Sequence, residues 1–489
     1  MNLNKIQKIV IVGGGSAGWI AATALSHQLG NIFDITVIES PTINTIGVGE
    51  ATIPTLKRFH QLLHIDEIDF MRETNATFKL GIQFENWLNG NDKYMHAFGR
   101  IGQPTWLADF HHFWLQGKSI GITQPLNDYQ LEYLAALDGK FTTDNLNYAY
   151  HLDAACYINF LRKRSLKQGV KLVTSTVTQV IQDHSTGDIL SLELDSGKSI
   201  KGDLFIDCTG FQGLLIEKTL HSGFDDWSHW FPCNRAVAVQ SASNGAVKPF
   251  TRAIAHQSGW RWEIPLQNRC GNGVVFAESE MSVDEASEYL LSSLGGKATS
   301  DINSINFRPG KRRQFWKKNC VALGLSSGFL EPLESTSIHL FISGITRLMQ
   351  LISNERITLK IINEYNKRSE QELIGIRDFL ILHYVQTQRA DSKFWRHCKN
   401  MDIPGSLKDR IEMFKESGHA FQYKDELFRV ESWLQVLLGQ GVYPEEYHPL
   451  AKGISNTQLT GLLSNIRDTL QNKLLSMPTH DIFIQSYLN

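Results

Sequence analysis

The first part of the chain alternates between short apolar runs and a stretch of helical character. Lys8–Val12 is rich in β-branched residues, residues 19–29 are rich in alanine and leucine, and Phe33–Glu39 is again largely apolar. These runs predict a strand, a helix and a second strand. Because glycines separate the first strand from the helix, we expect parallel strands with nucleotide phosphates at the N-terminus of the helix.

Further strands are predicted well beyond this first unit. Turn-rich residues at 186–188 and 268–272 separate apolar runs of strand length, and the second of these turns indicates an antiparallel hairpin. The expected strands are, in chain order, Lys171–Val180, Ile189–Leu194, Asp203–Cys208, Trp260–Pro265 and Gly273–Phe276.

Helical spacing replaces strand spacing near residue 338. The apolar residues recur every three or four positions, at Ile338, Phe341, Ile345, Leu348 and Ile352. The sequence therefore predicts an α/β fold with mixed sheets over residues 1–345, including an antiparallel hairpin region at about 230–280. A mainly helical module over residues 346–489 is expected to pack against it.

Charge and cysteine usage narrow the possible classes of protein. The 489 residues include 48 Lys and Arg against 50 Asp and Glu, so the composition gives no support for nucleic-acid binding. The six cysteines are scattered, which indicates neither a metal site nor a disulfide framework. Since no apolar run has the length of a membrane span or of a secretory core, we expect a cytoplasmic protein that does not bind membranes.

The glycines at the start of the chain have the spacing of a dinucleotide-binding turn, Gly13-x-Gly15-x-x-Gly18. Glu39 ends the second predicted strand, where a carboxylate accepts hydrogen bonds from the ribose of a bound adenosine. The alternative is an ordinary turn between a strand and a helix.

Trp260-Arg261-Trp262-Glu263-Ile264-Pro265 is the most distinctive segment of the chain. Side chains two apart on a strand share a face, so Trp260 and Trp262 are expected to form one apolar wall that ends at a proline. The alternative is that these are two ordinary core tryptophans.

Lys79 lies in a stretch that reads as one strand, residues 78–85. Phe78, Leu80, Ile82 and Phe84 alternate along it, so Lys79 should point to the opposite face. For an arbitrary strand lysine that face is solvent, which is the alternative to a functional role.

A second polar cluster, Glu334-Ser335-Thr336-Ser337, precedes the predicted helix. A Ser/Thr cluster there is a normal N-cap. The backbone N–H groups of a helix N-terminus also form a site for a small anion, so both interpretations are open.

These motifs, together with Gly47-Val48-Gly49-Glu50-Ala51-Thr52 and Pro332-Leu333-Glu334-Ser335-Thr336, resemble those of the flavin-dependent halogenases of the tryptophan halogenase family. The landmarks run from residue 9 to about residue 345. The resemblance implies a Rossmann-like FAD-binding module of the flavin monooxygenase type. It also implies that a separate reductase supplies FADH2, that a flavin hydroperoxide oxidises chloride or bromide, and that hypohalous acid then reaches an aromatic substrate.

The resemblance also assigns roles to individual residues. Lys79, Glu334 and Ser335 are catalytic, with Lys79 activating the hypohalous acid either through a hydrogen bond or as a haloamine, and Glu334 facing the substrate. Thr336 and Ser337 bind the halide, His96 and Phe98 line the substrate slot, and Trp260 and Trp262 shield the flavin. The implied flavin contacts are Gly13, Gly15, Ala17, Gly18, Glu39, Gly49, Glu50, Ala51, Val177, Leu325 and Ile338.

The implied substrate is a small indole-like aromatic compound. The segment Trp433–Leu450 does not reproduce the tyrosine-rich segment that holds free tryptophan in tryptophan-specific members. Bare indole, a substituted indole and a tryptophan residue within a peptide therefore stay open. The alternatives to a halogenase are a flavin-dependent aromatic hydroxylase and a non-catalytic protein that binds reduced flavin, and family resemblance suggests a homodimer.

Overall fold

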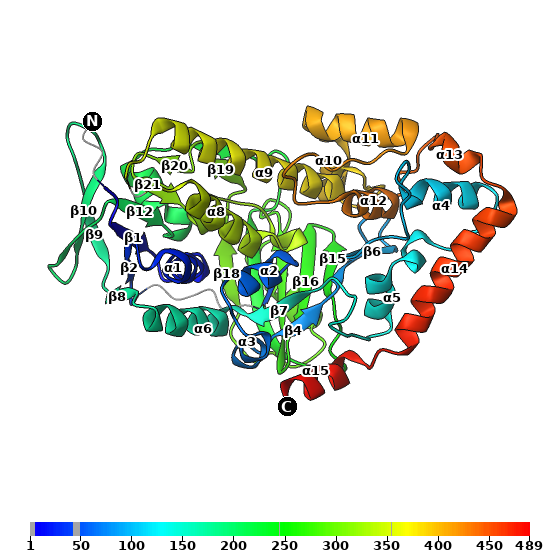
Figure 1. Ribbon diagram of the computed structural model, residues 1–489, viewed down its shortest axis with the longest axis horizontal. Helices are drawn as coiled ribbons and strands as arrows, with labels where there is room; N and C mark the ends of the chain where they lie inside the picture. Colours follow the sequence, from blue (N-terminus) through cyan, green and yellow to red (C-terminus); the bar gives the residue numbers. More distant parts are fainter. Residues whose placement is uncertain (1–4, 43–48, 244, 354) are drawn as a thin grey trace. The chain divides into compact units, whose positions relative to one another are not determined.

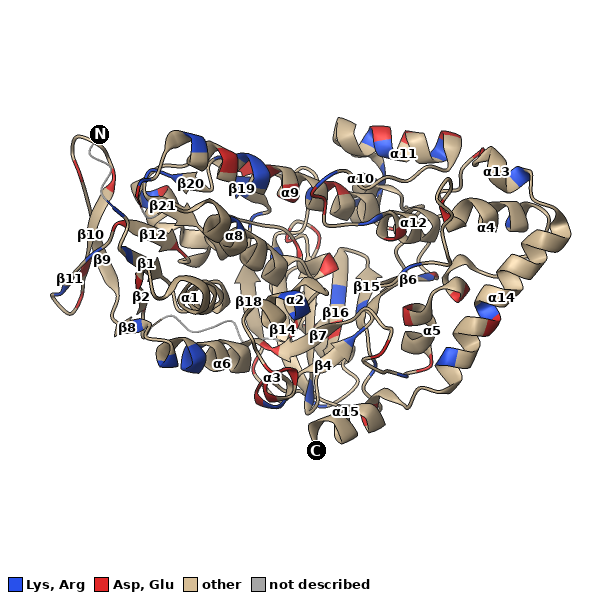
Figure 2. Cartoon of the chain, in the orientation of Figure 1, with Lys and Arg blue, Asp and Glu red and all other residues tan. Residues whose placement is uncertain are grey.

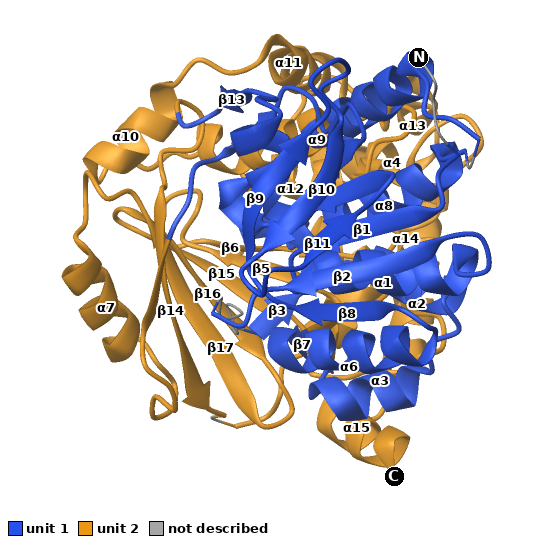
Figure 3. Ribbon diagram, turned by 90° about the vertical axis from the view of Figure 1, so that its left-hand side faces the viewer, with its two compact units in different colours: residues 1–76, 152–228, 306–373 blue, residues 77–151, 229–305, 374–489 orange. Residues whose placement is uncertain are grey.

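The computed structural model describes residues 5–42, 49–243, 245–353 and 355–489 (Figure 1). Gly47 and Val48 of the predicted flavin motif lie outside these residues. By its internal contacts the chain divides into two compact units, which are interleaved in sequence (Figure 3). Unit 1 comprises residues 1–76, 152–228 and 306–373, and unit 2 comprises residues 77–151, 229–305 and 374–489.

A six-stranded sheet organises unit 1. The strand β1 (Lys8–Val12) lies at its centre and pairs in parallel with β2 (Asp34–Glu39) and β12 (Leu204–Asp207). The predicted strand, helix and strand are therefore confirmed. The full order is β20 (Trp316–Lys317), β21 (Cys320–Ala322), β12, β1, β2 and β8 (Lys171–Thr174), with only β20 antiparallel to its neighbour.

Helix α1 (Ser16–Leu29) follows β1 and is the most enclosed helix of this sheet. Its residues 17–26 are all buried, and it contacts both α6 (Ala154–Lys167) and α8 (Ser337–Leu351). A helix buried all round needs small side chains to let its neighbours approach, which accounts for its alanine-rich sequence. This packing places the N-terminus of α1 at the carboxyl end of β1.

The single strand predicted over Lys171–Val180 is wrong. The chain forms β8 and then β9 (Val177–Gln182), and these belong to different sheets. The break falls at Ser175 and Thr176, where the carboxylate of Asp195 accepts hydrogen bonds from the Ser175 hydroxyl and, at 3.1 Å, from the Thr176 N–H. Strand β9 pairs instead with β10 (Ile189–Leu194), and β10 pairs with β11 (Ser199–Lys201).

Unit 2 contains a seven-stranded sheet. The predicted hairpin is confirmed as β16 (Gly259–Pro265) and β17 (Arg269–Phe276), although its turn is shorter than expected because Pro265 already pairs with Cys270. The order is β18 (Asn303–Asn306), β14 (Arg235–Ala242), β17, β16, β15 (Thr251–His256), β5 (Gly81–Glu85) and β6 (Lys93–Ala97).

The expected strand over residues 78–85 is also two strands. The chain leaves β4 (Thr77–Lys79) at Leu80, whose N–H donates to the Pro249 carbonyl at 2.7 Å, and re-enters a different sheet as β5. Strand β4 pairs with β7 (Ala149–Asp153). The alternation of apolar residues is real, but burial on both sides of the break replaces the single apolar face that the pattern predicted.

After β22 (Gly328–Phe329), every element assigned in the described part of the chain is a helix, as predicted. Acidic and basic residues are interspersed on the outer helices α11 (Gly405–Ser417) and α14 (Asn456–Leu475) (Figure 2). Among the described helices, none combines the length and the apolar character needed to cross a membrane. The division of the chain into modules near residue 345 stays a prediction.

The remaining helices of unit 1 are α2 (Thr55–Leu62) and α3 (Glu67–Thr74), and α9 (Leu359–Val385) contributes residues to both units. The remaining helices of unit 2 are α4 (Phe110–Ser119), α5 (Leu131–Leu137), α7 (Val283–Ser292), α10 (Lys393–Asn400), α12 (Val430–Gly439), α13 (Pro449–Lys452) and α15 (His480–Leu488).

Candidate active site

The glycines that precede α1 form a concave turn in unit 1. Gly13 has φ +120°, and a Cβ there would overlap the carbonyl of Cys208. A Cβ on Gly18 would overlap the carbonyl of Gly13. By contrast, no atom of the described chain lies within 4 Å of a Cβ built on Gly15, which caps α1 without a side-chain hydrogen bond. The turn therefore leaves an open space at a helix N-terminus, which suits a phosphate group.

Glu39 lies beside this turn, at the end of β2. Its Oε1 accepts from Arg162 Nη1 at 3.4 Å. Its Oε2 is buried and has no hydrogen-bond partner among the described residues. A buried carboxylate oxygen without a donor is costly, so this atom is suited to receive a hydroxyl from a bound molecule, as a ribose would supply. A Cβ on Gly14 would overlap the Glu39 side chain, which would then have to move from this position.

Five other predicted flavin contacts come from short elements of the same unit. Gly49, Glu50 and Ala51 form β3 (Gly49–Ala51), and burial raises the pKa of the Glu50 carboxyl to about 7. Leu325 lies in the 3-10 turn Gly324–Ser326, where a Cβ on Gly324 would come within 2.6 Å of the Ala17 Cβ. This turn is thereby held against α1. Val177 lies half-buried in β9.

The Asp207-Cys208-Thr209-Gly210 turn also lies against Gly13, because the Cys208 carbonyl faces it. Asp207 is fully buried, and its carboxylate accepts hydrogen bonds from the N–H groups of Thr209, Leu215 and Ile216 at 2.8–2.9 Å. Its oxygens thus hold the chain after β12 in place. Asp207 therefore has a structural role in shaping this turn.

The predicted halide residues lie at the start of α8. Ser335 adopts a left-handed conformation with φ +58°, and Glu334, Ser335 and Thr336 are all buried. Of the two interpretations of this cluster, the ordinary side-chain N-cap is wrong, because Thr336 has helical dihedral angles and makes no capping side-chain hydrogen bond in this described segment. Ile338 is buried in the first turn of α8. The backbone here turns sharply into a helix N-terminus without a capping hydroxyl.

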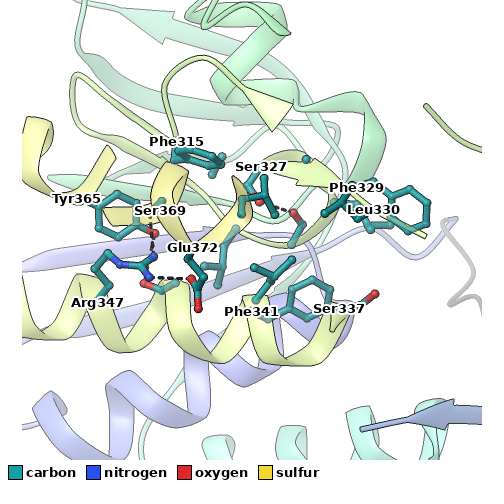
Figure 4. A pocket seen from close by; sticks show the side chains of 18 residues that line it. Phe315, Ser327, Phe329, Leu330, Ser337, Phe341, Arg347, Tyr365, Ser369 and Glu372 are labelled. Carbon is teal, nitrogen blue, oxygen red and sulfur yellow. Dashed lines mark hydrogen bonds and ion pairs between the residues drawn. The ribbon is translucent and has the colours of Figure 1, made fainter. Parts of the chain in front are cut away.

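A hollow lies in unit 1 between α8, α9 and the chain around the 3-10 turn Gly324–Ser326 (Figure 4). Leu325 and Ser337, a predicted flavin contact and a predicted halide contact, both line it. Leu330 and Phe341 supply apolar wall, and Arg347 supplies a polar end. The hollow thus reaches residues from both predicted sites.

A buried ionic network at this polar end was not predicted from the sequence. Glu372 accepts from His339 Nε2 at 2.9 Å and from Arg347 at 2.7 Å, and His339 Nδ1 contacts Thr55 at 3.1 Å. Although burial opposes ionisation, the hydrogen bonds and charges of His339 and Arg347 lower the pKa of Glu372 to about 2. The network ties α8 to α9 and α2. No sequence signal identifies it, because its members are far apart in the chain.

Lys79 is fully buried in unit 2, so the solvent-facing alternative is wrong. Its ammonium lies 5.3 Å from the centroid of the Phe98 ring, a distance at which a cation is attracted to an aromatic face. Lys79 ends β4 opposite Ala149 of β7. The pattern of the sequence identified the residue, but only the second strand shows that its face is enclosed.

The predicted aromatic wall is present on β16. Trp260 and Trp262 are 2% and 8% exposed, and their ring centroids are 6.0 Å apart. Trp262 lies over Gly273 of the neighbouring strand, since a Cβ there would overlap its indole ring. Arg261 and Glu263 form an ion pair at 2.5 Å on the opposite face. The two tryptophans therefore share one face, as the alternation predicts.

His96 and Phe98 lie in and just after β6, within an aromatic cluster. Their ring centroids are 6.4 Å apart, and the His96 ring also contacts Phe379 at 5.5 Å and Phe428 at 6.1 Å. Phe379 and Phe428 are stacked at 3.7 Å. Phe98 is thus shared by the Lys79 contact and by this cluster.

Comparison with known proteins gives extensive matches. The sequence model of the tryptophan halogenase family matches residues 8–456. A solved flavin-dependent halogenase from Xanthomonas campestris is 47% identical, with a TM-score of 0.98 over 99% of both chains. One from Brevundimonas sp. BAL3 is 40% identical, with a TM-score of 0.95 over 99% of both chains. The tryptophan 7-halogenase RebH of Lentzea aerocolonigenes is 34% identical over 98% of each sequence.

Proposed function

Because the chain belongs to the tryptophan halogenase family and is a flavin-dependent halogenase, we propose that it halogenates an indole-like aromatic compound with chloride or bromide. FADH2 supplied by a separate reductase is part of this proposal. The observation that carries it is Lys79, a fully buried lysine over the Phe98 ring in a member of this family. Burial of a lysine costs free energy and is therefore uncommon away from functional sites, which favours a functional role.

The residues around the N-terminus of α1 fit a flavin dinucleotide. The open space at Gly15 would receive the pyrophosphate, and the Oε2 atom of Glu39 would accept a ribose hydroxyl. Gly13 and Gly18 keep the backbone close enough for this contact, and Ala17 keeps the helix surface small. Reduced flavin with oxygen would supply the oxidant that converts halide to hypohalous acid.

The start of α8 is the proposed halide site. Backbone N–H groups at a helix N-terminus favour anions, and the hydroxyl of Thr336 makes no capping bond in the described segment. Ser335 holds the turn that directs this backbone, and Glu334 is the proposed acceptor of the ring proton or the group that stabilises the cationic ring intermediate. Both residues are buried, which strengthens electrostatic effects at this position.

Lys79 is proposed to hold the halogenating species for attack on the substrate. An ammonium donates a hydrogen bond to hypohalous acid and increases its electrophilicity, whereas a neutral amine forms a haloamine. The cluster that includes His96 and Phe98 would bind a flat aromatic ring through stacking and edge contacts. Trp260 and Trp262 are proposed to keep the organic substrate away from the flavin.

The proposed substrate class is supported by the names of relatives and by residues 433–450, which do not reproduce the tyrosine-rich segment of tryptophan-specific members. RebH is named as a tryptophan 7-halogenase, and another solved relative, 25% identical to this chain, is named as a tryptophan 5-halogenase of lanthipeptides. We propose an indole, free, substituted or within a peptide, in preference to free tryptophan. A homodimer is also proposed from family membership.

The proposal is tested by incubating the purified protein with FAD, a flavin reductase, NADH, oxygen, bromide and a panel of indoles. Mass spectrometry is expected to show the bromine isotope pattern in a product, and Lys79→Ala should abolish it while FAD binding persists. Catalase controls for peroxide chemistry. Bromination that survives Lys79→Ala would contradict the role of Lys79, and a hydroxylated product formed without halide would identify an aromatic hydroxylase.

A further inference from the structure

A chain of side-chain hydrogen bonds lies beside Lys79 in unit 2. His151 on β7 is the direct cross-strand partner of Thr77 on β4. Its Nδ1 lies 3.1 Å from the Thr77 Oγ1, and its Nε2 lies 2.9 Å from the Thr251 Oγ1. The Thr77 hydroxyl also donates to the Pro265 carbonyl at 2.7 Å. These hydrogen bonds thus connect β15, β7 and β4 to the last residue of β16.

The direction of each hydrogen bond follows from the number of protons available. The single hydroxyl proton of Thr77 is donated to the Pro265 carbonyl, so Thr77 Oγ1 must accept from His151 Nδ1–H. In a neutral imidazole the other nitrogen is then an acceptor, and it receives the hydroxyl proton of Thr251. In the opposite tautomer, Nδ1 would carry no proton, and its lone pair would face a lone pair of the Thr77 Oγ1. His151 is therefore the Nδ1–H tautomer.

The surroundings of His151 keep it neutral. Its side chain is fully buried, and burial first, then the charge of Lys79 and the proximity of His480, hold its pKa well below 6.5. His480 itself contacts the Val247 carbonyl at 2.8 Å, and burial lowers its pKa to about 4 although Asp481 opposes this. Protonation of His151 and of His480 beside Lys79 is thus disfavoured.

The same contacts determine where Lys79 is held. Thr77 and Lys79 are two apart on β4 and share a face with His151 and Ala149 of β7. The hydroxyl of Thr77 therefore fastens the strand to its neighbours two residues before Lys79. Its acceptor, Pro265, ends the strand that carries Trp260 and Trp262. A shift of β4 would move the Lys79 ammonium relative to the Phe98 ring.

We propose that His151 is a positioning residue for Lys79. In its neutral Nδ1–H form it orients Thr77, anchors β4 to the end of β16, and avoids a second positive charge beside the Lys79 ammonium. This inference rests on the proposed function of Lys79.

The test compares two variants of Thr77. Thr77→Val has a similar shape but removes the hydroxyl and its hydrogen bonds, whereas Thr77→Ser keeps the hydroxyl. Displacement of a catalytic group by about 1 Å costs up to roughly 100-fold in rate. We expect Thr77→Val to lower the rate of product halogenation by roughly 10- to 100-fold, with FAD affinity and substrate KM unchanged. A hypohalous acid trap should capture the halogen lost from the product. Thr77→Ser should restore the wild-type yield of halogenated product. A wild-type yield in Thr77→Val would overturn the proposal.

Two further measurements test the proposal without requiring catalytic turnover. The acetylation rate of Lys79 relative to the other lysines, read by mass spectrometry, should rise in Thr77→Val and return in Thr77→Ser. Selective ¹⁵N labelling of histidine, with His151→Gln for assignment, should show the neutral Nδ1–H tautomer at pH 7. An Nε2–H tautomer, an imidazolium, or an unchanged Lys79 acetylation rate would overturn the inference. If the wild type halogenates no indole while these two results hold, the proposed function fails and the positioning of Lys79 stands.

Discussion

The pairing of Trp262 with Gly273 gives a sharp prediction for the substitution Gly273→Ala. Gly273 lies directly across from Trp262 in the hairpin of β16 and β17. The three atoms nearest to an added Cβ, Cζ2, Cη2 and Cε2, all belong to the six-membered ring of the indole, and Cε2 would lie 2.6 Å away. Side-chain carbons do not approach so closely. Since Trp262 is only 8% exposed and Trp260 lies beside it, the indole has little room to retreat.

The expected cost is that of overpacking a well-filled core, about 1–3 kcal/mol. At about 2–4 °C per kcal/mol for a domain of this order of size, the thermal midpoint should fall by roughly 2–12 °C. Gly461→Ala is the matched control. Gly461 lies in α14, and its added Cβ would meet no atom of the described chain within 4 Å. There the same chemical change should stabilise the helix by about 0.5–1 kcal/mol.

Thermal unfolding followed by circular dichroism measures both effects, and near-ultraviolet dichroism reports on the indole of Trp262. The variant Trp262→Phe removes most of the overlapping ring, so Gly273→Ala should cost less in that background, with a coupling of about 0.5–3 kcal/mol. An unchanged or raised midpoint for Gly273→Ala would refute the reasoning. An equal cost with Trp262 or Phe at this position would show that the strain lies elsewhere.

Three further predictions concern the flavin site and the response to acid. Glu39→Ala should weaken FAD binding by roughly 10- to 100-fold, because a hydrogen bond to a charged group contributes about 1.5–3 kcal/mol, whereas Glu39→Gln should retain part of it; fluorescence titration measures both, and equal affinities would contradict the assignment. Gly13→Ala should abolish FAD binding, since φ is +120° and the methyl group would overlap the Cys208 carbonyl; a normal titration would exclude this close approach. Burial first, then the charges of His111 and two other histidines, lower the pKa of His112 from 6.5 to about 3, so the folded state disfavours its protonation. Stability present above pH 6.5 should therefore decrease as the pH falls towards 3, and His112→Gln should flatten the decline in thermal midpoint between pH 7 and 4.5.

Local patterns along the chain determined the elements whose form depends on nearby residues. The strand Lys8–Val12, the following helix and the strand ending at Glu39 were predictable, because β-branched runs, alanine-rich stretches and glycines act through neighbours in sequence. The shared face of Trp260 and Trp262 was predictable for the same reason, since alternation is a property of any strand. Family membership was also recognisable from such motifs.

Only the tertiary structure decided where the strands break and what the polar groups contact. Leu80 leaves its strand for the Pro249 carbonyl, so the face of Lys79 is enclosed instead of exposed. His151 joins Thr77 and Thr251, and no local signal in the sequence relates these three positions. Burial and hydrogen bonding depend on partners that folding brings from distant segments, and they determine both the tautomer of His151 and the position of the strand that carries Lys79.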